Sequence, residues 1–187
     1  MSNADDIRAG FTILNDFKLF NKTVVYYETH MEPRVYAEIA EFLSGWLRAN
    51  GWQSTYKPKQ ELTALWVRPL AWDGHAWFQL ERRRNASNSY QLADLCGVGE
   101  DRFGFRFRSE YDWKGGADEW IALLVGHGWE HEGNGVYFLP VTLPAGQLAL
   151  AWQRDDLRPA FEPLERALDR LKEDIVHFDR MLAMLKR

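Results

Sequence analysis

The chain has 187 residues, 46% hydrophobic and 27% charged, with a net charge of −4 at pH 7. These values are typical of a globular domain and exclude a disordered tail, and the negative charge excludes a general attraction to nucleic acid or anionic lipid. The sequence shows no apolar run that could cross a bilayer, its first residues are acidic and so do not predict a signal peptide, and the single Cys96 cannot form an internal disulfide. We therefore expect a cytoplasmic protein that does not bind membranes, with Cys96 as a small buried residue.

The first third of the chain predicts two short strands and a helix. Residues 1–10 show no clear pattern, whereas Phe11–Leu14 and Thr23–Thr29 are rich in β-branched and aromatic residues. Each of these two segments predicts a strand. Apolar residues then recur at helical spacing from Pro33 until Gly51, which predicts a helix that begins near the proline and ends at the glycine.

After residue 51 the apolar residues recur with the period of a strand. Four strands are expected, at Leu62–Leu70, His75–Arg83, Ser89–Leu95 and Arg102–Ser109. Because turn residues separate these segments, we expect an antiparallel meander. Phenylalanines and arginines alternate in the last strand, which is typical of a strand with one buried face and one solvent-exposed face.

The second half adds a helix, a strand and a short apolar segment, at Ala117–Gly126, Val136–Thr142 and Leu148–Trp152. The chain also contains nine tryptophans, most of them beside other apolar residues. Such side chains can stack on bases or sugars, but their neighbours favour a place in the core.

The C-terminal stretch carries a heptad pattern. Its apolar residues follow each other in steps of four and three: Leu157, Phe161, Leu164, Leu168, Leu171, Ile175, Phe178, Leu182 and Leu185. This predicts one long amphipathic helix that begins between Pro159 and Pro163. Its broad apolar face favours docking on the chain's own domain, and a homodimer through this helix is the alternative. We therefore divide the chain into an α+β domain, residues 1–152, and a heptad helix, residues 153–187.

Two short patterns could carry metal chemistry. The stretch from His127 to His131 fits the H-x-x-E-H pattern of zinc proteases, but the glycines around it indicate a turn, and a third ligand would have to come from a distant acid such as Glu162. Asp73 and Glu81, at the two ends of one predicted strand and followed by Arg83, resemble the acids of magnesium-dependent nucleases. Arginine cannot replace the lysine of those sites, so we expect no metal, no cofactor and no catalytic residue.

Five arginines form the candidate binding site: Arg82, Arg84, Arg102, Arg106 and Arg108. In a meander several of them could share one face of the sheet and, with nearby aromatic residues, bind phosphates and stack bases. The alternative is a solvated face on which these arginines pair with the acids Glu81, Glu100, Asp101 and Glu110.

Residues 62–185 resemble the C-terminal accessory region that follows the catalytic domain in some phage-associated and bacterial proteins of the PD-(D/E)XK nuclease superfamily. The segments that carry this resemblance are Leu65–Pro69, Ala76–Glu81, Gly97–Gly99, Gly135–Pro140 and Phe178–Leu182. The chain lacks the acids and the acid-x-lysine motif that define the nuclease. The resemblance therefore implies an accessory, binding or assembly role, which could be exercised near DNA. It carries over no catalytic residue.

The sequence as a whole predicts an α+β fold: a mostly antiparallel sheet with helices packed on one face and a long C-terminal amphipathic helix. We expect a non-catalytic binding or assembly module of a bacterial or phage system, which recognises protein or nucleic acid through a basic sheet face. The alternatives are a metal-dependent hydrolase or nuclease and a purely structural dimer.

Overall fold

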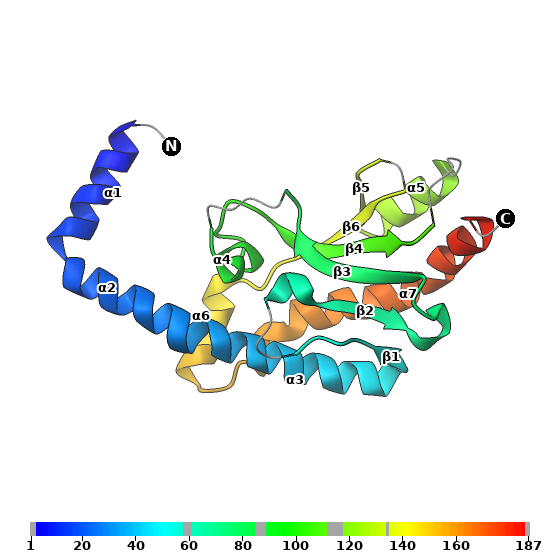
Figure 1. Ribbon diagram of the computed structural model, residues 1–187, viewed down its shortest axis with the longest axis horizontal. Helices are drawn as coiled ribbons and strands as arrows, with labels where there is room; N and C mark the ends of the chain where they lie inside the picture. Colours follow the sequence, from blue (N-terminus) through cyan, green and yellow to red (C-terminus); the bar gives the residue numbers. More distant parts are fainter. Residues whose placement is uncertain (1–2, 58–60, 85–88, 112–117, 134, 186–187) are drawn as a thin grey trace. The chain divides into compact units, whose positions relative to one another are not determined.

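The computed structural model describes residues 3–57, 61–84, 89–111, 118–133 and 135–185 (Figure 1). The chain divides into two compact units, residues 1–35 and residues 36–187. The second unit contains a six-stranded antiparallel sheet, helices and a long C-terminal helix. The predicted α+β fold class is therefore confirmed.

The first unit is helical. It contains α1 (Asn3–Asn15), α2 (Phe17–Tyr26) and the π-helical turn η1 (Tyr27–Met31), and α3 (Glu32–Asn50) begins at its end. Asp16 caps α2, because its carboxylate accepts a hydrogen bond from the backbone N–H of Leu19 at 3.2 Å.

The two strands predicted in this unit are wrong. Ile7, Phe11 and Leu14 are spaced by four and three residues, which is the repeat of a helix, and this wins over the strand preference of the short segment. The hydroxyls of Thr23 and Thr29 each donate to the carbonyl oxygen four residues earlier, so these β-branched residues satisfy their polar groups inside helical backbone.

The sheet of the second unit has the strand order β1-β2-β3-β4-β6-β5, and every neighbouring pair is antiparallel. Its strands are β1 (Trp52–Gln53), β2 (Trp66–Pro69), β3 (Ala76–Arg82), β4 (Phe103–Ser109), β5 (Glu130–His131) and β6 (Tyr137–Val141). The first four strands form an antiparallel meander, in which β2, β3 and β4 correspond to predicted strands and β1 does not. The β6–β5 pair extends the sheet beyond β4.

Two of the predicted strands differ in the structure. Only part of Leu62–Leu70 is strand, because the 3₁₀ turns η2 (Leu62–Ala64) and η3 (Leu70–Trp72) lie before and after β2. The predicted strand Ser89–Leu95 is wrong, since these residues contain the helix α4 (Gln91–Leu95). Leu92 and Leu95, three residues apart, are both buried, so the segment buries one side of a helical turn.

The remaining helices are α5 (Asp118–Gly126), α6 (Ala145–Gln153), the 3₁₀ turn η4 (Arg158–Phe161) and α7 (Glu162–Leu185). As predicted, the long helix begins between Pro159 and Pro163. The apolar segment at residues 148–152 belongs to α6. None of the helices in the described ranges combines the length and the apolar character that a membrane span requires.

The core lies between one face of the sheet and the helices α3 and α7 (Figure 1). The ring of Phe178 in α7 lies 5.0 Å from that of Phe78 in β3 and 4.7 Å from that of Phe107 in β4. The indole of Trp72 donates to Asp179 of α7 at 2.7 Å, which adds a polar contact beside the apolar ones. The apolar side of α7 thus packs against the sheet of its own chain.

Candidate functional site

The face of the sheet opposite α3 and α7 carries polar and aromatic side chains. Trp66, Gln79, Arg106 and Phe138 are successive register partners on β2, β3, β4 and β6, so their side chains share one face. Side chains alternate along a strand, which places every second residue with them. We call this surface the open face: Trp66, Arg68, Trp77, Gln79, Glu81, Arg83, Arg102, Gly104, Arg106, Arg108 and Phe138.

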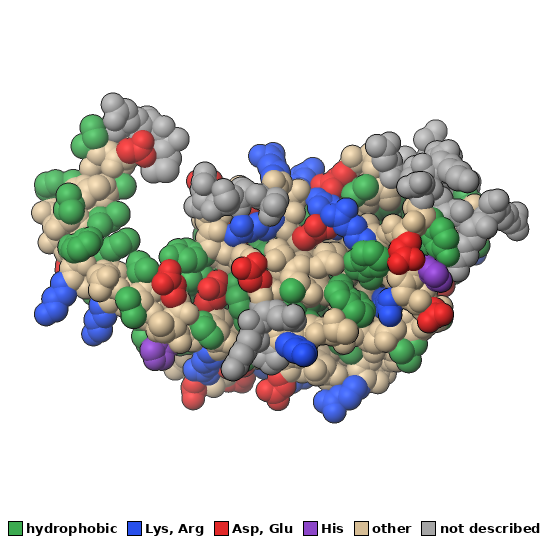
Figure 2. Space-filling view, viewed as in Figure 1, with side chains coloured by type: hydrophobic (Ala, Val, Ile, Leu, Met, Phe, Trp, Pro, Cys, Tyr) green, Lys and Arg blue, Asp and Glu red, His purple; other side chains and the backbone are tan. Residues whose placement is uncertain are grey.

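A chain of ion pairs crosses the open face, and we call it the charge ladder. Its members alternate in sign, in the order Arg102, Glu130, Arg83, Glu132, Arg106, Glu81 and Arg108. The contacts between neighbours measure between 2.8 and 3.3 Å. Four arginines and three glutamates leave one net positive charge. Figure 2 shows the basic and acidic side chains gathered side by side over β3 and β4.

Arg106, in the middle of the ladder, has a structural role, because its side chain is engaged in contacts within the chain. Its side chain is 10% exposed, and its guanidinium lies 5.3 Å above the ring of Phe138. Its Nη2 also donates to the backbone oxygen of Arg83 at 3.0 Å. Arg108, at the end of the ladder, is 41% exposed, and its Nε and Nη2 donate to Glu81 at 3.0 and 2.9 Å. Of Arg106 and Arg108, Arg108 is therefore the one that a ligand can reach.

The charge ladder contains only part of the predicted arginine set. Arg102, Arg106 and Arg108 belong to the charge ladder. Arg82 is the register partner of the buried Phe103, so it starts from the other face of the sheet, and its Nε contacts the Asp94 carboxylate at 2.8 Å. Arg84 follows the end of β3 and is exposed, and its backbone N–H donates to Asp101.

Sequence reasoning missed the place of Arg83 in this set. Arg83 contacts both Glu130 at 2.9 Å and Glu132 at 3.2 Å, and so joins the two halves of the charge ladder. The signal that could have found it is the period of two in β3, because Arg83 lies two residues after Glu81. Of the acids expected to pair with the arginines, Glu81 does so, whereas Glu110 contacts His75 at 3.1 Å.

Two adjoining hollows lie on this side of the sheet. The larger, of about 750 Å³, is lined by Glu61, Thr63, Trp77, Gln79, Glu81, Arg82, Arg83, Arg84, Gln91, Arg106 and Arg108. The smaller, of about 280 Å³, is lined by Trp66, Arg68, Gly74, Trp77 and Gln79. Since Trp77 and Gln79 line both, the hollows form one surface that combines tryptophans with arginines. The Arg68 guanidinium lies 5.0 Å from the centre of the Trp66 ring, so one cation is already stacked there.

The structure separates the two acids of the nuclease-like pattern. Asp73 ends η3 in the left-handed conformation, with φ of 46°, before β3 begins. Glu81 lies near the other end of β3, and both Arg106 and Arg108 contact it. The arrangement offers no shared metal position for this pair.

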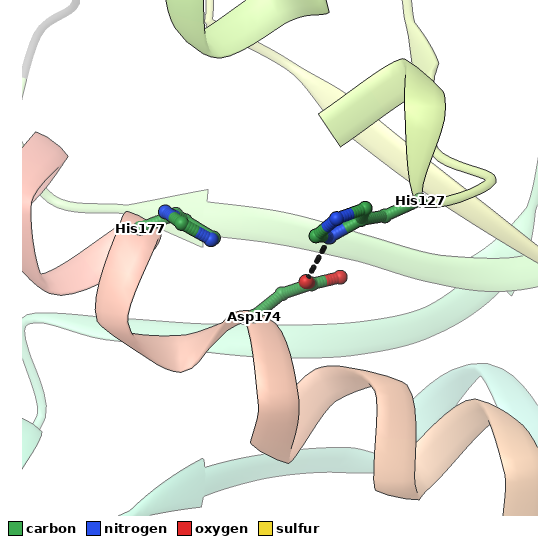
Figure 3. A group of neighbouring side chains, drawn as sticks. All are labelled: His127, Asp174 and His177. Atoms are coloured by element: carbon green, nitrogen blue, oxygen red, sulfur yellow. Dashed lines mark hydrogen bonds and ion pairs between the residues drawn. The ribbon is translucent and has the colours of Figure 1, made fainter. Parts of the chain in front are cut away.

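His127 and His131, the two histidines of the zinc-protease pattern, have different neighbours. The ring of His131 lies 5.1 Å from that of Tyr137. The Nδ1 of His127 lies 2.5 Å from Oδ1 of Asp174 in α7, and His177, one turn later in α7, is the next neighbour (Figure 3). The other oxygen of Asp174 accepts a hydrogen bond from the Trp129 indole at 2.7 Å. Glu162, named as an example of the distant acid that a zinc site of this pattern would require, pairs with Arg166.

Cys96 is buried, as the sequence indicated. Burial raises the pKa of its thiol to about 11. Because the thiolate is the nucleophilic form, this cysteine is poorly suited to attack a substrate at neutral pH.

Comparison of the chain with protein-family models, with curated proteins and with solved structures gave no match. The resemblance of residues 62–185 to a nuclease accessory region therefore stays a prediction.

Proposed function

We propose that this chain is a non-catalytic binding module whose open face receives single-stranded nucleic acid. The observation that carries the proposal is the pair of adjoining hollows, of which one is lined by Trp66 and Trp77 and the other by Trp77, Arg84 and Arg108. Proteins that bind single strands combine aromatic side chains, on which bases stack, with cations that contact the backbone phosphates. The alternative is that the same surface binds a protein partner. The experiment below distinguishes the two.

The roles within the hollow follow from exposure and geometry. Trp77 lines both hollows, and its indole N–H donates to the Gln79 side chain at 3.1 Å, which holds the ring in place. Gln79 in turn donates to the carbonyl oxygen of Thr63. A ring fixed in this way loses little conformational freedom when a base stacks on it. We assign base stacking to Trp77 and phosphate contacts to Arg84 and Arg108.

The charge ladder sets the expected strength of binding. A guanidinium has five N–H donors, and the bonds from Arg108 to Glu81 use only part of them, so a phosphate can be added without breaking the ladder. The lining of the larger hollow contains five arginines and two glutamates, but further acids neutralise several of those arginines. With two or three phosphates neutralised, log K should fall with log salt with a slope of roughly −1.4 to −2.

The test is a titration of fluorescently labelled single-stranded DNA and RNA, with duplex DNA alongside, at two salt concentrations. We expect preference for single strands and a loss of roughly 5-fold to 150-fold on Trp77→Ala, since a stacked base contributes about 1–3 kcal/mol. Arg108→Ala should lower both the affinity and the salt dependence, while Arg106 keeps Glu81 paired.

Arg166→Ala is the matched control, because Arg166 lies on α7 with a side chain that is 65% exposed. Its loss should leave binding unchanged. Absence of binding to any nucleic acid at low salt would remove this proposal and leave a protein partner for the open face.

The resemblance to a nuclease accessory region is compatible with such a role beside a catalytic domain, and we propose it only at that level. A homodimer remains a proposal as well, but α7 already buries Leu164, Leu168 and Leu171 to within 2% exposure. A dimer would therefore have to form through another surface.

A further inference from the structure

We propose that His127, Asp174 and His177 form a zinc-binding site, independent of the open face. Asp174 and His177 are three residues apart in α7, so they lie on the same side of the helix, and His127 follows the end of α5 (Figure 3). One ligand atom from each residue lies within 4.8 Å of the other two. Three potential metal ligands from two segments that are distant in sequence thus come together.

The charge of Asp174 supports a cation at this position. The residue is 1% exposed, and its partners in the described part of the chain are His127 and Trp129, neither of which carries a permanent positive charge. Buried Asp94, by contrast, contacts Arg82. A buried carboxylate is costly unless it is paired, and a divalent cation would supply the opposite charge that no lysine or arginine within the described residues provides here.

The ligand set fits zinc. Two imidazoles and one carboxylate bind Zn²⁺ at about 2.0–2.2 Å, which in a tetrahedron places the ligand atoms roughly 3.3 Å apart. Since the ligand atoms lie within 4.8 Å of one another, metal binding requires them to move closer by at most roughly 1.5 Å. The side chain of His127 is 36% exposed, and His177 is also partly exposed.

A second contact around the site favours the same assignment. The Trp129 indole holds Oδ2 of Asp174 and leaves Oδ1 directed toward His127. Hydrogen bonds of this kind orient metal-binding carboxylates in proteins. Three protein ligands would leave at least one coordination position for water.

The test uses the full chain without a histidine tag, after treatment with a chelator. Titration with Co²⁺, which reports zinc-type geometry through its visible absorption bands, should reach one ion per chain, and Zn²⁺ should displace it. His177→Ala should weaken binding by more than about 10-fold, and Asp174→Asn should do the same. The asparagine keeps an acceptor for Trp129, so circular dichroism should show the fold intact.

His131→Ala is the matched control, since His131 is four residues from His127 and packs on Tyr137. We expect it to bind Co²⁺ and Zn²⁺ as the unchanged protein does. The proposal is overturned if the unchanged protein binds neither ion, or if folded His177→Ala and Asp174→Asn variants retain full affinity. It is equally overturned if His131→Ala lowers the affinity as much as His177→Ala.

Discussion

Gly104 lies directly beneath the ring of Phe138 on the open face. A Cβ at this position would come within 2.8 Å of Cε2 of that ring and would also meet the carbonyl oxygen of Leu139. Backbone and a buried ring cannot move aside cheaply, so the absence of a side chain is a packing requirement here.

We therefore expect Gly104→Ala to lower the free energy of unfolding by about 1–3 kcal/mol, the cost of overpacking a core. Gly45→Ala is the matched comparison: it lies inside α3, has nothing within 4 Å of its added Cβ, and should stabilise the protein by about 0.5–1 kcal/mol. Urea unfolding of both variants measures the two effects. The same sign for both would contradict the packing argument.

Cys96 gives a second test at the level of a residue. Because burial raises the pKa of its thiol from 9.0 to about 11, the thiolate fraction near pH 8 is roughly 100-fold lower than in an unfolded chain. Alkylation by iodoacetamide should be slower by at least that factor in buffer than in urea, and should keep rising with pH up to about 11.

The same shift fixes the sign of a pH effect on stability. The folded state favours the protonated thiol. The contribution of Cys96 to the free energy of unfolding is therefore complete below pH 9 and is lost as the pH rises from 9 through 11. Comparison with Cys96→Ala isolates this contribution from that of Tyr137, whose pKa burial also raises. A native alkylation rate equal to that in urea would contradict the burial of this thiol.

The arginines show which part of the candidate site could not be predicted from the sequence. The sequence indicated that β4 would present Arg106 and Arg108 on its wet face, because they alternate with buried phenylalanines. It could not show whether the even or the odd residues of β3 join them, since that depends on the pairing register. The register pairs Gln79 with Arg106, and Arg83 rather than Arg82 joins the charge ladder.

Among the elements, α7 places an aromatic side chain in the middle of the core. Its Phe178 is fully buried, with the rings of Phe78, Phe107, Trp129 and Tyr137 around it at 4.7–6.1 Å. Phe178→Ala should therefore cost about 3–5 kcal/mol of the free energy of unfolding, through lost burial and the remaining cavity.

Val176→Ala serves as the control in the same helix. Val176 is 43% exposed, so its truncation should change the free energy of unfolding by no more than about 0.5 kcal/mol. Denaturation by urea, followed by circular dichroism, measures both variants. Similar losses for the two would show that α7 is stabilised without this docking contact.

The longest periodic elements were predictable, whereas α1, α2 and α4 were not. The heptad pattern of α7 and the helix before Gly51 repeat over many residues, so the period is unambiguous. Leu92 and Leu95 of α4 belong to a helix of five residues, over which helix and strand periods cannot be told apart. The histidine cluster was out of reach as well, because it joins His127 to a helix that begins 35 residues later.

At the scale of the whole molecule, the two ends of the chain differ in what they bury. The described residues from Ala4 to Arg34 include none that is buried, whereas α7 and the turn before it contain Leu157, Phe161 and Leu168, each at most 1% exposed. A chain that ends at Asp156 should expose the core and aggregate. A chain that lacks residues 1–26 should stay folded with its urea midpoint nearly unchanged. Size-exclusion chromatography and urea unfolding of both shortened chains check this.

The outermost strands of the sheet, β1 and β5, have two residues each. An incoming strand finds its template in a row of unpaired backbone N–H and C=O groups, and two residues supply very few. We therefore expect β1 and β5 to be poor templates for a foreign strand. We expect little fibril-like stacking through these two strands at high protein concentration, and expect a peptide partner to be recognised mainly through its side chains.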